Sequence, residues 1–140
     1  MIIPINFKNP IHRKDIMILS KNNNFYINDL NFCINYIYPT DNNYNGFFII
    51  NGTIPNGFLI YYTRPTGYIS DITYLLIDKQ YINLGYEILL INKLIKLNVN
   101  NVIVIKSDND NWYMNLNFIN LDNYIKKIII KYPDPTKMDE

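Results

Sequence analysis

The sequence predicts a single α/β domain, with a mixed central sheet flanked by helices. Three features of the central region support this: β-branched and aromatic runs of strand length, an amphipathic helix, and a short apolar strand after it. Strands that alternate with helices are typical of α/β folds. A chain of 140 residues has the size of one domain. We expect residues 1–132 to form it and residues 133–140 to be a C-terminal tail.

The first half of the chain predicts an edge strand, a helix and a hairpin. Residues 2–7 form a short apolar segment, and Pro4 restricts that strand to the edge of a sheet. Residues 25–38 carry apolar side chains at helical spacing. The apolar runs 47–50 and 58–62 are separated by a stretch with glycine, proline and asparagine, which predicts a hairpin.

The second half predicts a long strand, a helix and the last strands. After a turn, residues 68–77 form a strand rich in β-branched residues. Residues 86–97 carry a broad apolar stripe at helical spacing. Residues 102–105 are entirely apolar, as expected for a strand that is covered on both faces. A short helix over 109–116 and one or two strands within 118–132 complete the domain.

The order of these elements predicts how the central strands pair. Strands 58–63 and 68–77 are joined by a tight turn, so we expect them to be antiparallel neighbours. The helix 86–97 is long enough for a crossover connection, so we expect strand 102–105 to run parallel to strand 68–77.

Two motifs follow the strands of this central region. After strand 68–77 the chain reads Tyr81-Ile82-Asn83-Leu84-Gly85-Tyr86-Glu87-Ile88. A strand, a glycine-containing loop and a helix in this order present backbone N–H groups to a phosphate. After strand 102–105 the chain reads Trp112-Tyr113-Met114-Asn115-Leu116-Asn117-Phe118.

Together these motifs resemble the GNAT family, the acyl-coenzyme A-dependent N-acetyltransferases, over roughly residues 46–130. The resemblance implies a GNAT-like domain in which the parallel strands splay apart in the middle of the sheet. It also implies acetyl-coenzyme A as co-substrate and an amine as acceptor. The implied cofactor-binding residues are Leu75, Ile77, Ile82, Asn83, Leu84, Gly85, Tyr86, Glu87 and Ile88.

The phosphate loop fits the family pattern in two registers. The pattern is Arg or Gln, two residues, Gly, one residue, then Gly or Ala. The preferred register keeps the helical stripe in phase and places Ile82, Gly85 and Glu87 at these positions. The alternative register places Gln80, Asn83 and Gly85 there, and asparagine tolerates a left-handed backbone better than most residues.

Glu87 has two interpretations in the preferred register. A carboxylate beside the phosphates of the cofactor would repel them and weaken binding. A carboxylate that points outward would only complement the dipole of the helix.

The resemblance also implies two catalytic residues. Asp71 falls where some members of the family carry a carboxylate that takes the proton of the amine nucleophile. Tyr113 falls at the position of the general acid, and a phenol with a pKa of about 10 can protonate a thiolate whose pKa is about 8.5. The alternatives are that Asp71 faces solvent without a catalytic role and that Tyr113 packs under the last strands.

Composition excludes several classes of function. The net charge is +1 with no dense basic block, so we expect no nucleic-acid partner. One cysteine and one histidine, Cys33 and His12, make no metal set. No apolar run approaches the ~18 residues of a membrane span. We expect a cytoplasmic protein, in the host cytoplasm or the virion if the source is a virus.

The amino-acid composition also indicates a bias in codon usage. The chain contains 24 Asn and 27 Ile but no Ala. Asn, Ile, Lys and Tyr have AT-rich codons, so we expect an AT-rich genome, such as that of a large DNA virus. We therefore expect many asparagines to reflect codon pressure and asparagine-rich stretches to be loops.

The sequence therefore predicts an N-acetyltransferase that transfers an acetyl group directly from acetyl-coenzyme A to an amine. Asp71 and Tyr113 favour this enzyme. The alternative is a catalytically inactive protein of the same fold with a binding or structural role, which Ile82 and Glu87 favour.

Overall fold

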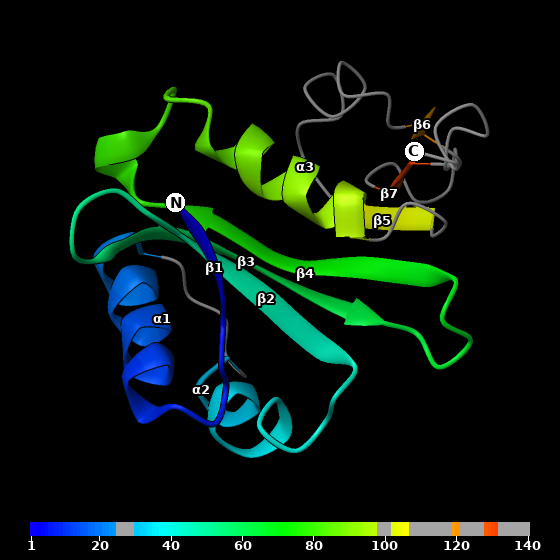
Figure 1. Cartoon of the computed structure of the whole chain (residues 1–140), viewed down its shortest axis with the longest axis horizontal. Helices are drawn as coiled ribbons and strands as arrows, with labels where there is room; N and C mark the ends of the chain where they lie inside the picture. The colour runs from blue at the N-terminus through cyan, green and yellow to red at the C-terminus, as the bar shows by residue number, and fades with distance from the viewer. Residues whose placement is uncertain (25–29, 98–101, 107–118, 121–127, 132–140) are drawn as a thin grey trace.

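The computed structural model describes residues 1–24, 30–97, 102–106, 119–120 and 128–131. Within these residues the strands form one sheet in the order β1-β2-β3-β4-β5-β7-β6 (Figure 1). The strands are β1 (Ile2–Pro4), β2 (Tyr44–Ile50), β3 (Pro55–Thr63), β4 (Ile69–Ile77), β5 (Val102–Lys106), β6 (Ile119–Asn120) and β7 (Ile128–Lys131). The helices are α1 (Pro10–Asn22), α2 (Leu30–Phe32), the π-helix η1 (Cys33–Ile37), the 3-10 helix η2 (Lys79–Tyr81) and α3 (Tyr86–Leu97).

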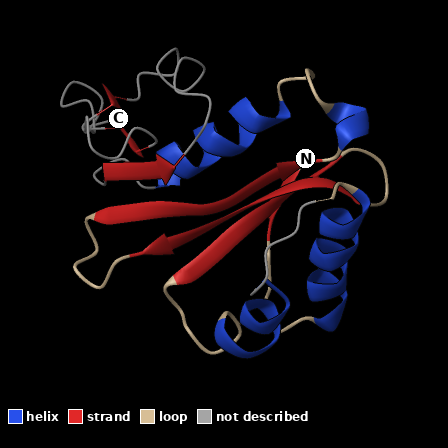
Figure 2. Ribbon diagram, turned by 180° about the vertical axis from the view of Figure 1, so that it is seen from behind, coloured by secondary structure: helices blue, strands red, loops and turns tan. Residues whose placement is uncertain are grey.

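Helices cover both faces of the sheet. Helix α1 lies with α2 and η1 on one face, and α3 lies on the other (Figures 1 and 2). Successive side chains of a strand point to opposite faces. Phe47 and Ile49 of β2 therefore pack with Leu90 of α3, whereas Phe48 packs with Ile16 of α1. This double coverage explains why the central strands are apolar along most of their length.

The central part of the predicted fold is confirmed. Strand β3 pairs antiparallel with β4, and β4 pairs parallel with β5. Helix α3 has the predicted bounds, and β6 and β7 are the predicted last strands. The hairpin strands β2 and β3 are longer than predicted. The predicted helix over 109–116 and the tail at 133–140 lie outside the described residues.

The first 45 residues differ more from the expectation. Strand β1 is an edge strand but ends at Pro4, so the predicted length was too great. Helix α1 was not predicted, because its apolar stripe is narrow. A local signal was present: the Asn9 side chain accepts a hydrogen bond from the Ile11 N–H at 2.9 Å, and Pro10 occupies the first helical position.

The helix predicted over 25–38 is confirmed in its described part. Residues 30–37 form α2 and then η1, and residues 25–29 lie outside the description. The π-helical step is closed by the Tyr38 N–H, which donates to the Cys33 carbonyl at 2.8 Å. Single π-helical turns are uncommon and often occur near functional sites.

Strands β4 and β5 stop pairing in the middle of β4. Their register runs from Ile69 opposite Val102 to Ile72 opposite Ile105, while β4 continues to Ile77. The parallel pairing of β4 with β5 thus covers the first half of β4, and residues 73–77 continue the strand beyond it. This is the geometry expected of parallel strands that splay apart.

A β-bulge in β4 lies at the same point. Tyr61 of β3 is opposite Ile72, but the preceding residue Ile60 is opposite Tyr74, so Thr73 is the additional residue. Because of this extra residue, Ile72 packs on the α3 face and Tyr74 on the α1 face. The bulge changes which side chains of β4 face each layer at the point where β5 departs.

Gly57 allows β3 and β4 to approach closely at the end of β4, where it lies opposite Ile77. A Cβ atom at Gly57 would lie 2.6 Å from the Ile77 Cδ1 atom and 2.7 Å from the Leu76 carbonyl oxygen. We expect Gly57→Ala to lower the free energy of unfolding by about 1–3 kcal/mol, as overpacking does. Urea denaturation measures this difference. An unchanged free energy of unfolding would show that the two strands can separate here without cost.

Candidate functional site

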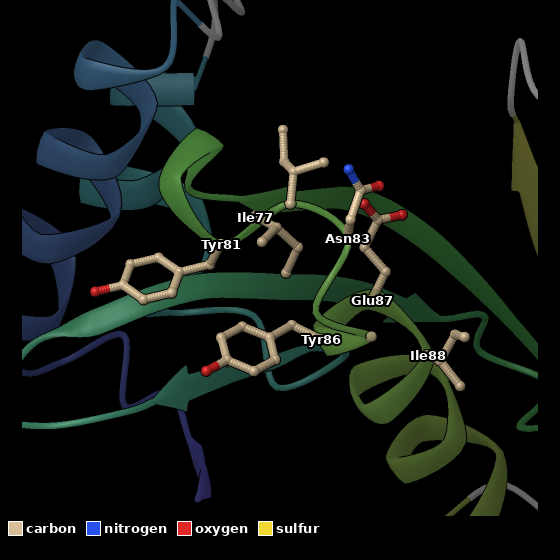
Figure 3. A pocket seen from close by; sticks show the side chains of 8 residues that line it. Ile77, Tyr81, Asn83, Tyr86, Glu87 and Ile88 are labelled. Atoms are coloured by element: carbon tan, nitrogen blue, oxygen red, sulfur yellow. The ribbon is translucent and has the colours of Figure 1, made fainter.

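A cavity of about 280 Å³ opens where β4 ends and the chain turns into α3 (Figure 3). It is lined by residues of the strand end, the loop and the first turn of the helix: Ile77, Tyr81, Ile82, Asn83, Gly85, Tyr86, Glu87 and Ile88. The structure thus brings together all the predicted cofactor residues except two. Leu75 packs against the core on the α3 side, and Leu84 is exposed to solvent.

The loop folds into this shape through local backbone preferences. Asn83 and Gly85 have φ angles of 73° and 80°, in the left-handed region that asparagine and glycine tolerate best. The Gly85 carbonyl accepts the first helical hydrogen bond, from the Leu89 N–H at 3.2 Å. Both sequence registers place Gly85 at a glycine position, and its backbone conformation meets that requirement in either.

The start of α3 offers main-chain hydrogen-bond donors to the cavity. The N–H groups of a first helical turn have no partner within the helix. Here they belong to Tyr86, Glu87 and Ile88, which all line the cavity. The positive end of the helix dipole adds to the attraction for an anion.

Glu87 places an opposing charge at the same position. Its side chain lines the cavity and is half-buried, and this burial raises the pKa of Glu87. In Figure 3 its carboxylate lies on the same side of the loop as the Asn83 side chain. Of its two interpretations, the one with the carboxylate beside the anion site is closer to this geometry.

Two tyrosines form an aromatic wall of the cavity. The rings of Tyr81 and Tyr86 are stacked, with centroids 5.9 Å apart and an interplanar angle of 17°. The Tyr86 hydroxyl accepts a hydrogen bond from the Asn51 Nδ2 atom at 3.0 Å. Tyr81 was not predicted as a site residue, because in the preferred register it precedes the first position of the loop motif.

Three asparagines outside the loop contribute to its support: Asn51, Asn56 and a residue of the opposite layer, Asn23. The Asp78 N–H donates to the carbonyl oxygen of the buried Asn56 at 2.8 Å. The Asn56 side chain donates to the Asn51 carbonyl at 3.2 Å. The Lys79 N–H donates to the Asn23 side chain at 2.8 Å. These bonds hold the first residues of the loop, Asp78 and Lys79, against the sheet and the end of α1.

The predicted base Asp71 lies beside the point where β4 and β5 separate. Its partner in register is Val104, one position before the last pair of the two strands. Both carboxylate oxygens accept hydrogen bonds from Arg64, from Nε at 2.8 Å and from Nη2 at 2.9 Å. The same hydrogen bonding raises the pKa of Arg64. Tyr113, the predicted acid, lies outside the described residues.

Two other kinds of site are absent from the described part of the chain. No group of three or more His, Cys, Asp or Glu residues there is arranged to hold a metal ion. None of the helices described is both long and apolar enough to cross a bilayer.

Comparison with known proteins gives matches among solved structures. No family model matches the sequence, and no curated protein matches it. An aminoglycoside 6'-acetyltransferase type Ii aligns with a TM-score of 0.76 and 15% identity, over 96% of this chain and 99% of that chain. Tetrahymena GCN5 gives a TM-score of 0.74 and 11% identity, over 96% and 97%. An aminoglycoside 6'-N-acetyltransferase complexed with coenzyme A gives 0.71 and 12%, over 96% and 99%.

These similarities extend over nearly the whole length of each protein, at a level of identity where only the fold is shared. They include most of the first 45 residues, which lie outside the stretch of roughly 46–130 over which the sequence resembles the family. The chain has the fold of the GNAT acetyltransferases.

Proposed function

We propose that this protein is an N-acetyltransferase that transfers an acetyl group from acetyl-coenzyme A directly to an amine. One observation carries the proposal. The pairing of strand β4 with its parallel neighbour β5 ends at Ile72, and β4 continues to Ile77 and into a loop and helix start that offer main-chain donors. The similar structures named as acetyltransferases, one of them complexed with coenzyme A, support it.

The residues at this site fit coenzyme A in two places. Beyond the last pair with β5, the second half of β4 is the place where the amide-containing arm of the cofactor would lie beside the strand as an additional strand. The first turn of α3 offers N–H groups to the pyrophosphate. Among the described lining residues, Glu87 carries a charge that opposes an anion, so we expect binding to be weak and to rest on the main chain.

The thioester would supply an activated acyl carbon at the point where the strands separate. As the amine nitrogen bonds to this carbon, the carbon–sulfur bond breaks. In the proposed mechanism Asp71 takes the proton of the amine, directly or through a water molecule, and Tyr113 gives a proton to the departing sulfur. Asp71 is close enough to the separation point for this role, which it would perform while Arg64 holds its orientation.

Calorimetric titration with acetyl-coenzyme A tests the first part of the proposal. Heat of binding with one site per chain is the expected result, followed by acetylation of at least one member of a panel of amines. Absence of binding would refute the enzyme and favour a non-catalytic role for the fold. Binding without turnover on any amine would limit the protein to cofactor binding.

We expect Glu87→Gln to tighten the binding of acetyl-coenzyme A. Glutamine keeps the length of the side chain and its helix propensity but removes the charge beside the proposed pyrophosphate site. The gain is expected to be about 1 kcal/mol, roughly fivefold in affinity, at a pH where wild-type Glu87 is ionised. Equal affinities of the two proteins at that pH would show that Glu87 does not face the bound phosphates.

The pH dependence provides the control for this substitution. Because burial raises the pKa of Glu87, the wild-type carboxyl group gains its proton at a higher pH than an exposed one. Below that pKa the side chain is neutral, so the affinities of wild type and Glu87→Gln should converge. The same sign applies to folding: the ionised, half-buried carboxylate is unfavourable, so the variant should be the more stable protein at neutral pH and lose this advantage in acid.

A further inference from the structure

The end of helix α1 is hydrogen-bonded to the proposed cofactor loop, although the two belong to opposite layers. Helix α1 covers one face of the sheet, and the loop leads into α3 on the other (Figure 1). The bond joins the Asn23 Oδ1 atom, just after the end of α1, to the Lys79 N–H at 2.8 Å, across 56 residues of sequence. No local motif of the chain predicts a contact over this separation.

The Asn23 side chain is held from both ends of its amide. Its Nδ2 atom donates to the Leu19 carbonyl of α1 at 2.8 Å, while its Oδ1 atom accepts from Lys79. A backbone carbonyl only accepts and a backbone N–H only donates, so these two partners fix the orientation of the amide. A carboxamide satisfies both partners at once. An aspartate carboxylate can serve only the N–H, and leucine can serve neither.

The bond to Asn23 acts at the start of the segment that leads into the cavity. Lys79 is the first residue of η2, which ends at Tyr81 in the wall of the cavity. The preceding N–H, of Asp78, is bonded to Asn56 of β3. Two consecutive N–H groups are thus held by two different elements, one of them the α1 end. The bond to Asn23 therefore joins the start of η2 to the end of α1, while the bond of Asp78 joins the preceding residue to the sheet.

We propose that Asn23 is a positioning residue for the binding of acetyl-coenzyme A. Its side chain orders the start of the cofactor loop, at Lys79, by linking it to the end of helix α1. This inference rests on the proposed function. The hydrogen bond between Asn23 and Lys79 couples the end of α1 to the loop. A ligand bound at the loop then also stabilises the end of α1, and a change at the end of α1 alters affinity at the loop to the same extent.

Three variants separate this role from a general effect on stability. Asn23→Leu removes both hydrogen bonds of the amide. Asn23→Asp keeps the acceptor for the Lys79 N–H, replaces the donor to Leu19 by a second carboxylate oxygen and adds a negative charge. Asn22→Leu is the matched control, because it makes the same substitution at the exposed neighbouring position of α1.

The first measurement is hydrogen exchange of the Lys79 amide in the protein without ligand, followed by NMR. We expect exchange in Asn23→Leu to be about fivefold faster than in wild type, as expected when one hydrogen bond of about 1 kcal/mol is lost. Exchange in Asn23→Asp and Asn22→Leu should stay close to wild type. Unchanged protection of the core amides of Leu59 and Ile60 would show that the fold of Asn23→Leu is intact.

The second measurement is the calorimetric affinity for acetyl-coenzyme A. We expect Asn23→Leu to bind about two- to tenfold more weakly than wild type and Asn22→Leu to bind like wild type. Asn23→Asp is compared at about 0.5 M salt, where a Debye length of about 4 Å screens its added charge. There it should recover most of the wild-type affinity.

The outcomes distinguish this inference from the proposed function. If wild type binds acetyl-coenzyme A and Asn23→Leu binds it with the same affinity, the role of Asn23 is overturned and the proposed function stands. Equal weakening by Asn23→Leu and Asn22→Leu would do the same, because it would indicate a general effect at the end of α1. Absence of binding by wild type would overturn the proposed function, and with it the cofactor role of Asn23.

Discussion

Replacing Tyr113 by phenylalanine is expected to lower the rate of acyl transfer by about 10²–10⁴-fold, the range typical of losing a general acid. Phenylalanine keeps the aromatic ring and removes only the hydroxyl group. The departing sulfur would then lose its proton donor while the affinity for acetyl-coenzyme A stays the same. The measurement is kcat on an amine found in the acceptor panel, together with the affinity for acetyl-coenzyme A from calorimetry.

A second tyrosine provides the control for this substitution. Tyr36 is 68% exposed on η1, so Tyr36→Phe removes a hydroxyl that contacts mainly solvent and should leave kcat unchanged. A melting curve separates the catalytic from the structural interpretation of Tyr113. If its hydroxyl is bonded only for structure, Tyr113→Phe would cost about 0.5–1.5 kcal/mol of stability and leave the rate intact. That result would remove Tyr113 from the mechanism.

The central sheet and α3 could be predicted from the sequence because their signals are strong and local. Strand β3 is almost wholly buried, and α3 presents Leu90, Ile91 and Leu94 to the core on one face. Helix α1 has a weaker pattern, since Ile16 and Leu19 are its buried apolar residues and the rest of the helix is polar or partly exposed. A pattern that depends on two apolar positions does not stand out from its surroundings, although the Asn9 cap was visible.

The candidate site divides in the same way. A loop at a helix N-terminus is a local structure, so the lining residues between Ile82 and Ile88 could be predicted from one stretch of sequence, although the prediction also included the exposed Leu84. The supporting contacts are long-range: Asn51 reaches Tyr86 across 35 residues, and Asn23 reaches Lys79 across 56. The abundance of asparagine in the chain hid these residues further, because composition gave no reason to distinguish them from the other asparagines.

The register of the strands was the other feature that could not be predicted from the sequence. The bulge at Thr73 reverses the alternation of β4, so Ile72 and Tyr74 face opposite layers although they are two residues apart. The pairing of Asp71 with Arg64 also depends on the exact geometry of the β3–β4 turn. The strand that carries Asp71 could be predicted from the sequence, but its ion-pair partner Arg64 could not.

Replacing Asp71 by asparagine is expected to lower kcat by about 10²–10⁴-fold if its carboxylate takes the proton of the amine. Asparagine has nearly the same shape and still offers an oxygen to Arg64, but it cannot accept that proton. Removal of the other partner provides the comparison. Arg64→Gln breaks the same ion pair and leaves the carboxylate in place, so kcat should stay within about tenfold of wild type. Steady-state assays of the two variants under the same conditions measure this difference.

The stability of both variants shows whether the ion pair itself matters. The side chains of Arg64 and Asp71 are 46% and 30% exposed, and pairs of this kind contribute only about 0.2–1 kcal/mol. Both substitutions should therefore lower the free energy of unfolding by a similar, small amount. A base is lost in only one of them, so a large loss of rate confined to Asp71→Asn identifies a chemical role. Equal and small losses of rate in both variants would show that Asp71 serves the β3–β4 turn and takes no part in proton transfer.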